Sequence, residues 1–427
     1  MTHFNTSVFD FVGKGKNIFK FSFAPPAQGS QEGEVRCPKS GEGWKAAARG
    51  GRKGNCCCDG VEERGGFSNE TLARQEEPAA GAGLGGARSS ACCSERRPPL
   101  LSPRVGTFQV GSRGTIRDYT GFNASKDAET VRKAIKGIGT DEKTLISILT
   151  ERSNAQRQLM AKEYRAASGK DLKDDLKSDL SGNLERVIVA LVTPPAVFDA
   201  KQLKKSMKGS GTNEKALIEI LASRSSKQMK EVSQAYYTVY KKSLGDDISS
   251  DTSGDFRKAL LTLADGRRDE NVKVDEHLAK KDAQVLYSAG EKKWGTDEDK
   301  FTEILCLRSI PQLKLTFDEY RNISKKTIEE SIQGEMSGHF EDLLLAIVQC
   351  VTNTPAFFAE RLYQSLKGAG TDEFTLNRIM VSRSEIDLLD IRAEYKKHYG
   401  CSLYSAIKSD TSGDYKTTLL MICGGDD

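Results

Sequence analysis

A glycine–threonine pair recurs four times in this chain, and an acidic residue follows each threonine 39 residues later. The loops around these pairs read KGIGTDE, KGSGTNE, KKWGTDE and KGAGTDE. Glycine permits positive φ angles, so such a loop can turn main-chain carbonyl oxygens inward toward a cation. A distant carboxylate adds charge, and calcium prefers an oxygen shell of this kind. The four pairs are Thr140 with Asp179, Thr212 with Asp251, Thr296 with Glu335, and Thr371 with Asp410.

The first loop, from Ile135 to Thr140, shows how such a site would be built. Three loop carbonyls and a bidentate Asp179 would supply about five of the roughly 6–8 oxygens that calcium takes. Water or a phosphate oxygen would fill the remaining positions. Binding of calcium and of a phospholipid head group would then be mutually dependent, each raising the affinity for the other by the same factor.

Each loop taken alone also has an ordinary structural explanation. A Gly-x-Gly-Thr sequence before a helix is commonly a turn whose Thr caps that helix. One acid at a distance adds little to a single loop. A structural turn, however, gives no reason for a distant acid to recur in all four copies. We therefore interpret the four pairs as calcium sites.

The sequence between each threonine and its acid repeats as well, which defines four copies of one module. Counting from the threonine, every copy has Arg at position 12, Ser at 13, Tyr at 24 and Gly at 42. Apolar residues at positions 5, 8 and 9 form one stripe of an amphipathic helix. In three copies Gln follows the Ser three residues later, a capping box that predicts the start of a second helix. The pairs are Ser153 with Gln156, Ser225 with Gln228 and Ser309 with Gln312, while Asp387 follows Ser384 in the fourth copy, where we expect the same start.

The expected fold is all-α, with four repeats of about five short helices each. We predict repeats at 122–193, 194–266, 279–352 and 353–427, with a charged linker at 267–278. Residues 106–121 form a connecting segment before the first repeat. Residues 1–105 are rich in Gly, Arg, Ser, Ala and Pro and lack helical periodicity, so we expect a disordered, low-complexity leader.

Composition narrows the class of protein. A net charge of +4 is too small to indicate nucleic-acid binding. The longest uncharged apolar stretch, 343–351, is far shorter than the roughly 20 residues that span a bilayer. The N-terminus makes a poor secretory signal because Lys14 and Lys16 interrupt its apolar pattern. The repeat cysteines share no module position, which predicts free thiols in a reducing, cytoplasmic compartment.

Trp294 stands beside Gly295 in the third loop, where the other copies carry Ile138, Ser210 and Ala369. One interpretation is an indole packed within its own repeat. The other is a membrane contact, because indole favours the boundary between water and acyl chains. We expect the membrane contact.

These residues resemble the annexin family. The resemblance rests on the four repeats, the KGxGT loops, the acid at a fixed distance, and the motifs TERSNAQRQL, LADGRRDE and SDTSGDY, and it covers the chain from about Gly106 to Asp427. It implies a slightly curved disc of four five-helix domains that presents calcium sites on its convex face to acidic phospholipid.

The resemblance also assigns three main-chain carbonyl donors and one carboxylate to each repeat. The third loop departs from the KGxGT motif, and members of the family commonly show this variant in the third repeat. The implied calcium ligands are Ile135, Gly137 and Gly139 with Asp179; Met207, Gly209 and Gly211 with Asp251; Gly290, Lys293 and Gly295 with Glu335; and Leu366, Gly368 and Gly370 with Asp410.

The resemblance predicts a calcium-dependent phospholipid-binding protein, not an enzyme. It implies a cytoplasmic protein that is peripheral on the cytosolic face of membranes, with acidic phospholipid as its partner and no nucleic acid. Roles in membrane organisation or trafficking would follow, and so would inhibition of phospholipase A2 by sheltering the lipid. Partners that bind through the leader are not specified by the sequence.

Two alternatives stay open. A calcium-assisted phosphohydrolase or phosphodiesterase could act on head-group phosphate esters, since a partly open metal site facing phosphate is a precondition for that chemistry. Against it, the four histidines share no module position, and no nucleophile–base motif is visible. An interaction scaffold or ion-conducting assembly is the other alternative. Polar residues that match the family's central axis are Asp199, Glu219, Arg224 and Arg378.

Overall fold

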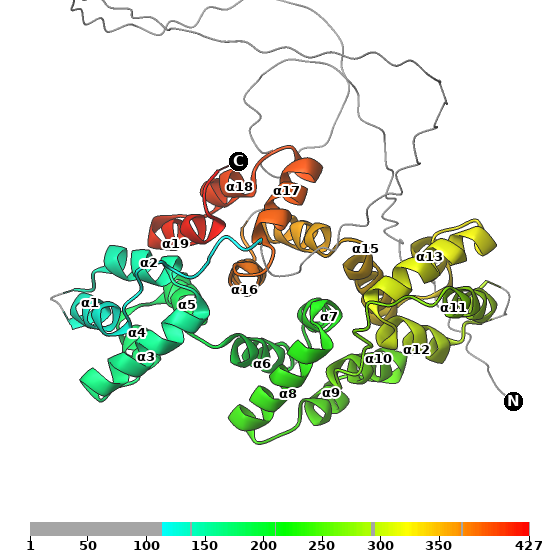
Figure 1. Ribbon diagram of the computed structural model, residues 1–427, viewed down its shortest axis with the longest axis horizontal. Coiled ribbons are helices and arrows are strands. Elements are labelled where there is room, and N and C mark those ends of the chain that lie inside the picture. Colours follow the sequence, from blue (N-terminus) through cyan, green and yellow to red (C-terminus); the bar gives the residue numbers. More distant parts are fainter. Residues whose placement is uncertain (1–112, 137–138, 210, 292–294, 369, 427) are drawn as a thin grey trace, which may run out of the picture.

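The computed structural model describes residues 113–136, 139–209, 211–291, 295–368 and 370–426. Within these ranges the chain forms helices and no β-strand. The helices gather in groups around a common centre (Figure 1). The predicted leader, part of the connecting segment, and three site candidates, Gly137, Lys293 and Trp294, lie outside the described residues.

The first two repeats follow the same five-helix plan, which confirms the predicted architecture. Repeat 1 consists of α1 (Ala124–Lys136), α2 (Glu142–Glu151), α3 (Asn154–Ser168), α4 (Leu172–Asp179) and α5 (Gly182–Leu191). Repeat 2 consists of α6 (Pro195–Ser206), α7 (Glu214–Ser223), α8 (Ser226–Tyr240), α9 (Leu244–Asp251) and α10 (Gly254–Ala264).

Repeats 3 and 4 share one long helix, α15 (Gly338–Leu366), between them. Repeat 3 begins with α11 (Glu276–Ala289), α12 (Glu298–Leu307), α13 (Ile310–Ser324) and α14 (Ile328–Glu335). Repeat 4 continues with α16 (Glu373–Arg383), α17 (Leu388–Tyr399), α18 (Leu403–Asp410) and α19 (Gly413–Cys423).

Among the described helices, α15 alone has the length and apolar composition to cross a bilayer. Its backbone leaves helical geometry at Asn353, where φ is −154° and ψ is 90°, two residues before Pro355. More than half of its most apolar stretch, 56%, is buried inside the protein. These features make α15 two core helices of neighbouring repeats joined at a kink.

The core of each repeat is built from the periodic apolar positions. Leu145 and Leu149 on α2 are buried, as are Leu172 and Leu176 on α4. Full burial of one such side chain stabilises the fold by about 1.5–3 kcal/mol. The repeated tyrosine at position 24 is also buried in every repeat, and in repeat 1 its hydroxyl donates to Asp175 over 2.6 Å.

Predicted capping boxes begin α3 and α8, where both reciprocal hydrogen bonds form. In α13 the Ser309 hydroxyl accepts from the Gln312 main chain, but the Gln312 side chain bonds the main chain of Asp275 instead. The expected start at Ser384 is wrong. Helix α16 runs to Arg383, and α17 begins only at Leu388.

An arginine–aspartate pair explains this difference in repeat 4. The repeated arginine at position 12 binds an aspartate of the first helix in repeats 1 to 3, with Nε–Oδ2 distances of 2.7, 2.7 and 2.6 Å. In repeat 4, Phe358 occupies the place of that aspartate, and the Arg383 guanidinium lies 4.5 Å from its ring centroid. Arg383 binds Asp387 instead, with its Nε 2.7 Å from Oδ1. The pairs of repeats 1 to 3 are Arg152–Asp127, Arg224–Asp199 and Arg308–Asp282.

The described part of the connecting segment joins repeat 1 to repeat 4. Ile116 donates its main-chain N–H to Ser384, and Arg113 accepts one from Leu389, each over 3.0 Å. Tyr119 exchanges two hydrogen bonds with the Gln156 side chain in repeat 1. The segment therefore closes the ring of repeats.

The cysteines of the repeats include both free thiols and a disulfide-bonded residue. Burial raises the pKa of the Cys306, Cys350 and Cys423 thiols to about 12, and these thiols are free. Cys401, in contrast, is disulfide-bonded, so the expectation of free thiols is wrong for this residue.

Candidate metal and membrane site

Each predicted loop is closed by one main-chain hydrogen bond between the first and second helices of its repeat. The residue after the threonine donates its N–H to the end of the first helix, over 3.0 Å in repeat 1 and 2.7 Å in repeat 2. The corresponding distances are 2.9 Å in repeat 3 and 2.8 Å in repeat 4. Residues 135–140, 207–212 and 366–371 lie between the bonded residues in repeats 1, 2 and 4, but 290–296 in repeat 3. The third loop is therefore one residue longer. The bonds join Asp141 to Ala134, Asn213 to Ser206, Asp297 to Ala289, and Asp372 to Ser365.

The loop backbone requires glycine at equivalent positions of repeats 2 and 4. Gly209 has a φ of +124° and Gly368 a φ of +121°, which residues with side chains rarely adopt. A Cβ atom on either residue would meet nothing within 4 Å. The requirement is thus conformational and not one of space, as expected for a loop that turns its carbonyls.

The predicted acids all occupy one structural position. Asp179, Asp251, Glu335 and Asp410 are each the last residue of the fourth helix of their repeat, and each is exposed. In repeats 1, 2 and 4, the serine before the aspartate donates to its Oδ1 over 3.1 Å. This contact orients the carboxylate at the helix end.

The threonine of each pair reaches its acid through a side-chain hydrogen bond in three repeats. Thr212 donates its hydroxyl to the main-chain carbonyl of Asp251 over 3.4 Å. Thr296 and Thr371 donate to the carbonyls of Glu335 and Asp410 over 3.2 and 3.3 Å. Thr140 and Asp179, although both are described, make no such bond with each other in repeat 1. The structure therefore joins three of the four predicted pairs directly.

The threonines do not cap the helices that follow them. The next residue does so: Asp141 accepts from Thr144 N, Asn213 from Ala216 N, and Asp372 from Thr375 N. The explanation of each loop as a Thr-capped turn is wrong for these three repeats. Because the cap is supplied elsewhere, the hydroxyls of Thr212 and Thr371 are available to hold the acid.

Among the described residues, no three His, Cys, Asp or Glu side chains gather closely enough to hold a metal ion by themselves. The implied donors are instead main-chain groups at the ends of helices. Ile135, Met207 and Leu366 are buried, so their side chains belong to the core and each could offer an ion its main-chain oxygen. Gly290 lies at the C-terminus of α11, with φ −102° and ψ −95°.

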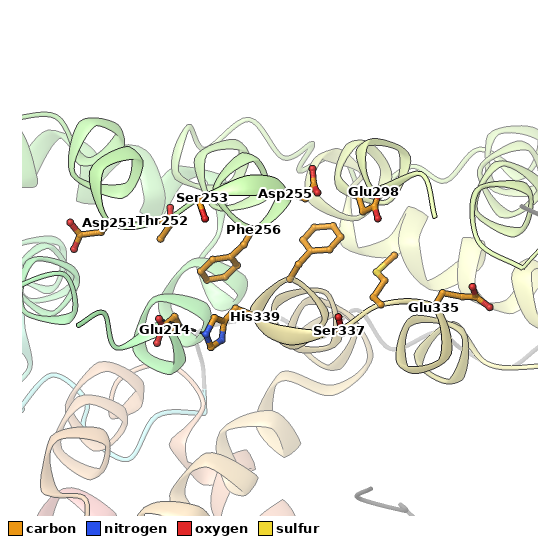
Figure 2. Close-up of a pocket in the computed structure, with 12 residues that line it drawn as sticks. Glu214, Asp251, Thr252, Ser253, Asp255, Phe256, Glu298, Glu335, Ser337 and His339 are labelled. Atoms are coloured by element: carbon orange, nitrogen blue, oxygen red, sulfur yellow. Dashed lines mark ion pairs between the residues drawn. The ribbon is translucent and has the colours of Figure 1, made fainter. Parts of the chain in front are cut away.

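A pocket of about 440 Å³ lies between repeats 2 and 3, and its two walls are equivalent by repeat position. Figure 2 shows Asp251 and Glu335 at opposite ends of this pocket. The His339 ring lies 5.7 Å from that of Phe256, and its Nε2 lies 3.7 Å from Glu214. The loop acids of two repeats therefore line one pocket. The equivalent lining pairs are Glu214 with Glu298, Asp251 with Glu335, Thr252 with Met336, Ser253 with Ser337, Asp255 with His339, and Phe256 with Phe340.

Contacts around Phe374 bring residues beside the second and fourth loops together with a helix of repeat 1. Phe374 lies two residues after Asp372, which closes the fourth loop, and Lys205 precedes Ser206, which closes the second. The Lys205 ammonium lies 3.0 Å from the Phe374 ring centroid. The Arg186 guanidinium, from the α5 helix that follows Asp179, lies 4.9 Å from it. The residues beside the second and fourth loops therefore lie close together, with α5 of repeat 1 next to them.

The polar residues assigned to the central axis form two separate ion pairs. Asp199 binds Arg224 within repeat 2, whereas Glu219 joins repeat 2 to Arg378 of repeat 4 over 2.7 and 2.8 Å. Burial raises the pKa of Glu219, but Arg378 and Arg361 outweigh it, so the pKa lies below its usual value. The buried Glu219 carboxylate is therefore ionised and holds two repeats together.

The comparisons with known proteins agree with this architecture. The sequence model of the family described as Annexin matches residues 126–191, 198–263, 281–347 and 357–422, once in each repeat. The chain belongs to the annexin family, which is a family of calcium-dependent phospholipid-binding proteins.

Individual relatives are closely similar. The chain is 81% identical over 318 residues to Annexin A3 of Homo sapiens, an alignment that covers 74% of this chain and 98% of that protein. The solved structure of annexin III is 81% identical and matches with a TM-score of 0.74, covering 74% of this chain and 99% of that one. The structure of calcium-bound annexin (Sm)1 is 38% identical and matches with a TM-score of 0.69, over 74% of this chain and 94% of that one. The predicted family and fold are confirmed, and calcium binding is supported at the level of the family.

Proposed function

We propose that this protein docks on acidic phospholipid membranes when calcium fills its loop–acid sites. The observation that carries the proposal is the threonine hydrogen bond that joins loop and acid in repeats 2, 3 and 4. It holds the end of the glycine loop beside an exposed carboxylate at a helix end. Carbonyl and carboxylate oxygens are the donors that calcium prefers.

The residues fit calcium best in repeats 2 and 4, where Gly209 and Gly368 adopt the positive φ that turns the loop. Calcium, when bound, would supply a Lewis-acidic position for a lipid phosphate oxygen. The protein would contribute loop carbonyls and one carboxylate, and would leave part of the ion's shell to the membrane. The proposed donors there are Met207, Gly209, Gly211 and Asp251, and Leu366, Gly368, Gly370 and Asp410.

Several weak sites on one rigid body bind a surface much more tightly than any one site does. On this basis we propose a peripheral role at cytosolic membrane faces, in membrane organisation or trafficking. A protein that covers acidic lipid would also inhibit phospholipase A2 by sheltering its substrate. We propose no catalytic activity. This would be contradicted if the pure protein hydrolysed head-group esters and a single substitution abolished that activity while lipid binding was retained.

The test is co-sedimentation with phosphatidylserine-containing vesicles across a calcium titration. The double variant Asp251→Ala/Asp410→Ala should need roughly tenfold more calcium for half-maximal binding, because two sites lose their carboxylate. The control is Asp246→Ala/Asp318→Ala, which removes two exposed acids away from the loops. An unchanged calcium midpoint in the first variant, with the fold intact by circular dichroism, would refute the proposal.

A further inference from the structure

We propose that Phe374, Arg186 and Lys205, here called the Phe374 cluster, form a second membrane contact that does not use calcium. Its partner would be the head-group region of an anionic bilayer. This inference rests on the proposed function, because it requires that the face carrying the loops meets the membrane.

The cluster is assembled by three repeats. Arg186 lies on α5 of repeat 1, Lys205 on α6 of repeat 2, and Phe374 in the first turn of α16 in repeat 4. Helices α5 and α16 pack against each other, and each lies on the side of its group that faces the centre of the molecule (Figure 1). Both cations lie over one aromatic ring, at 3.0 and 4.9 Å from its centroid. The cluster therefore lies where three repeats meet, beside the second and fourth loops.

The ring offers apolar surface that the protein does not cover. Phe374 is 42% exposed, so a large part of its ring faces solvent. The equivalent residues of the other repeats are Lys143, Lys215 and Asp299, so an aromatic residue occurs at this position only in repeat 4. A soluble anion would leave the ring exposed, whereas a bilayer would cover it.

The two cations lack an ion pair with a carboxylate in the described part of the chain. Arg186 donates to the amide oxygen of Asn183 over 2.8 Å. Burial, and then the charges of Arg186 and Arg378, lower the pKa of Lys205, while Asp372 acts in the opposite direction. Asp372 already caps α16, and Glu373 lies beside it. Arg378 is committed to Glu219. Lys205 and Arg186 are thus crowded cations that an external phosphate would relieve.

An aromatic ring flanked by cations is a combination suited to the membrane interface. The ring can enter the boundary between head groups and acyl chains, while the flanking ammonium and guanidinium groups reach phosphates. Each cation near an anionic surface strengthens binding by roughly fivefold. Removing both should therefore weaken vesicle binding by about 25-fold at most, and less where salt screens the surface.

The experiment uses the full chain and vesicles of mixed phosphatidylserine and phosphatidylcholine at saturating calcium. Phe374→Ala and Arg186→Gln/Lys205→Gln should each weaken vesicle affinity by roughly 5- to 25-fold, and excess calcium should not restore it. Tyr237→Ala, which removes an exposed aromatic residue of α8, is the matched control and should have no effect. Unchanged affinity in both cluster variants would overturn the inference.

A fluorescence measurement tests the contact directly, with a readout that does not depend on affinity. Phe374→Trp in a Trp44→Phe/Trp294→Phe background places the sole indole in the cluster. Its emission should shift to the blue on vesicle binding and be quenched by brominated lipid. An emission that does not respond would contradict the inference. The cluster variants could instead lose binding of inositol hexakisphosphate while their vesicle affinity stays unchanged. That result would show a site for a soluble anion and would overturn the inference.

The outcomes separate this inference from the proposed function. If Asp251→Ala/Asp410→Ala raises the calcium requirement but the cluster variants bind vesicles normally, only the present inference fails. If the aspartate variant leaves the calcium midpoint unchanged, the proposed function fails. Thermal unfolding of each variant should match that of the unmodified protein, since the three substituted side chains are exposed.

Discussion

Thr212 holds the carbonyl of Asp251 at a distance of 3.4 Å, across the gap between a loop and the end of another helix. The same relationship recurs in repeats 3 and 4, where the threonine and the acid are again 39 residues apart. The bond uses the acid's main chain and so leaves its carboxylate to face the loop or a cation. A spacing in the sequence thus corresponds to a contact in space.

Thr212→Val/Thr371→Val should weaken calcium binding without unfolding the protein. A neutral hydrogen bond contributes about 0.5–1.5 kcal/mol, so the calcium required for vesicle binding should rise roughly 2- to 10-fold. Thr212→Ser/Thr371→Ser keeps both hydroxyls and should bind normally. Thr140→Val is a control within the same chain, because Thr140 makes no bond to its acid. A Val variant indistinguishable from the Ser variant would show that the bond does not organise the site.

Glu219→Gln should destabilise the protein strongly, because it leaves Arg378 buried without its partner. Loss of one member of a buried pair lowers the free energy of unfolding by about 3–5 kcal/mol. Thermal or urea unfolding measures the effect. Glu276→Gln, at an exposed acid of α11, should change the free energy of unfolding by less than about 0.5 kcal/mol. Adding Arg378→Met to Glu219→Met should recover most of the loss, and failure to do so would argue against an unpaired charge as the cause.

Asp247 should make the protein sensitive to acid in a defined range. Burial raises the pKa of its carboxyl, but hydrogen bonds from Lys204, Tyr236 and Lys242 outweigh burial and lower the pKa from 3.8 to about 2. A carboxyl whose pKa is lower in the folded state than in the unfolded state stabilises the protein at pH values above its unfolded-state pKa. That contribution, roughly 2 kcal/mol, is lost as the pH falls from about 4 to about 2. Asp247→Asn should therefore show a smaller loss of stability over this range. Parallel curves for the two proteins would contradict the assignment.

Short-range features of the fold could be predicted from the sequence because they are fixed by neighbours along the chain. The Ser153–Gln156 and Ser225–Gln228 boxes need only one helical turn, and both form. The start of α17 could not be predicted in the same way. It depends on Arg383, which lacks the aspartate of the other repeats and binds Asp387. The missing aspartate would lie on the preceding helix, at the position of Phe358, so the residues next to Ser384 do not reveal the change.

In the candidate site, too, features within one repeat could be predicted from the sequence, whereas features that depend on packing between repeats could not. The glycine loops and their acids could be predicted because each repeat carries them at fixed spacing. The pocket between Asp251 and Glu335 could not, since it requires the packing of repeat 2 against repeat 3. Phe374 left one signal in the sequence, an aromatic residue where the other repeats have Lys or Asp. Its two neighbouring cations, Arg186 and Lys205, come from other repeats, and nothing in the sequence indicated that they would contact Phe374.

Gly114→Ala should detach the connecting segment from repeat 4. A Cβ atom at Gly114 would lie 2.5 Å from the main-chain carbonyl carbon of Glu385, and a main-chain atom cannot easily move away. The substitution should lower the free energy of unfolding by about 1–3 kcal/mol and speed tryptic cleavage after Arg117. Gly245→Ala is the control, because its nearest neighbour lies 3.5 Å away and alanine favours the α9 helix by about 0.5–1 kcal/mol. An unchanged cleavage rate for Gly114→Ala would show that the segment is held by other contacts, such as those of Tyr119 with Gln156.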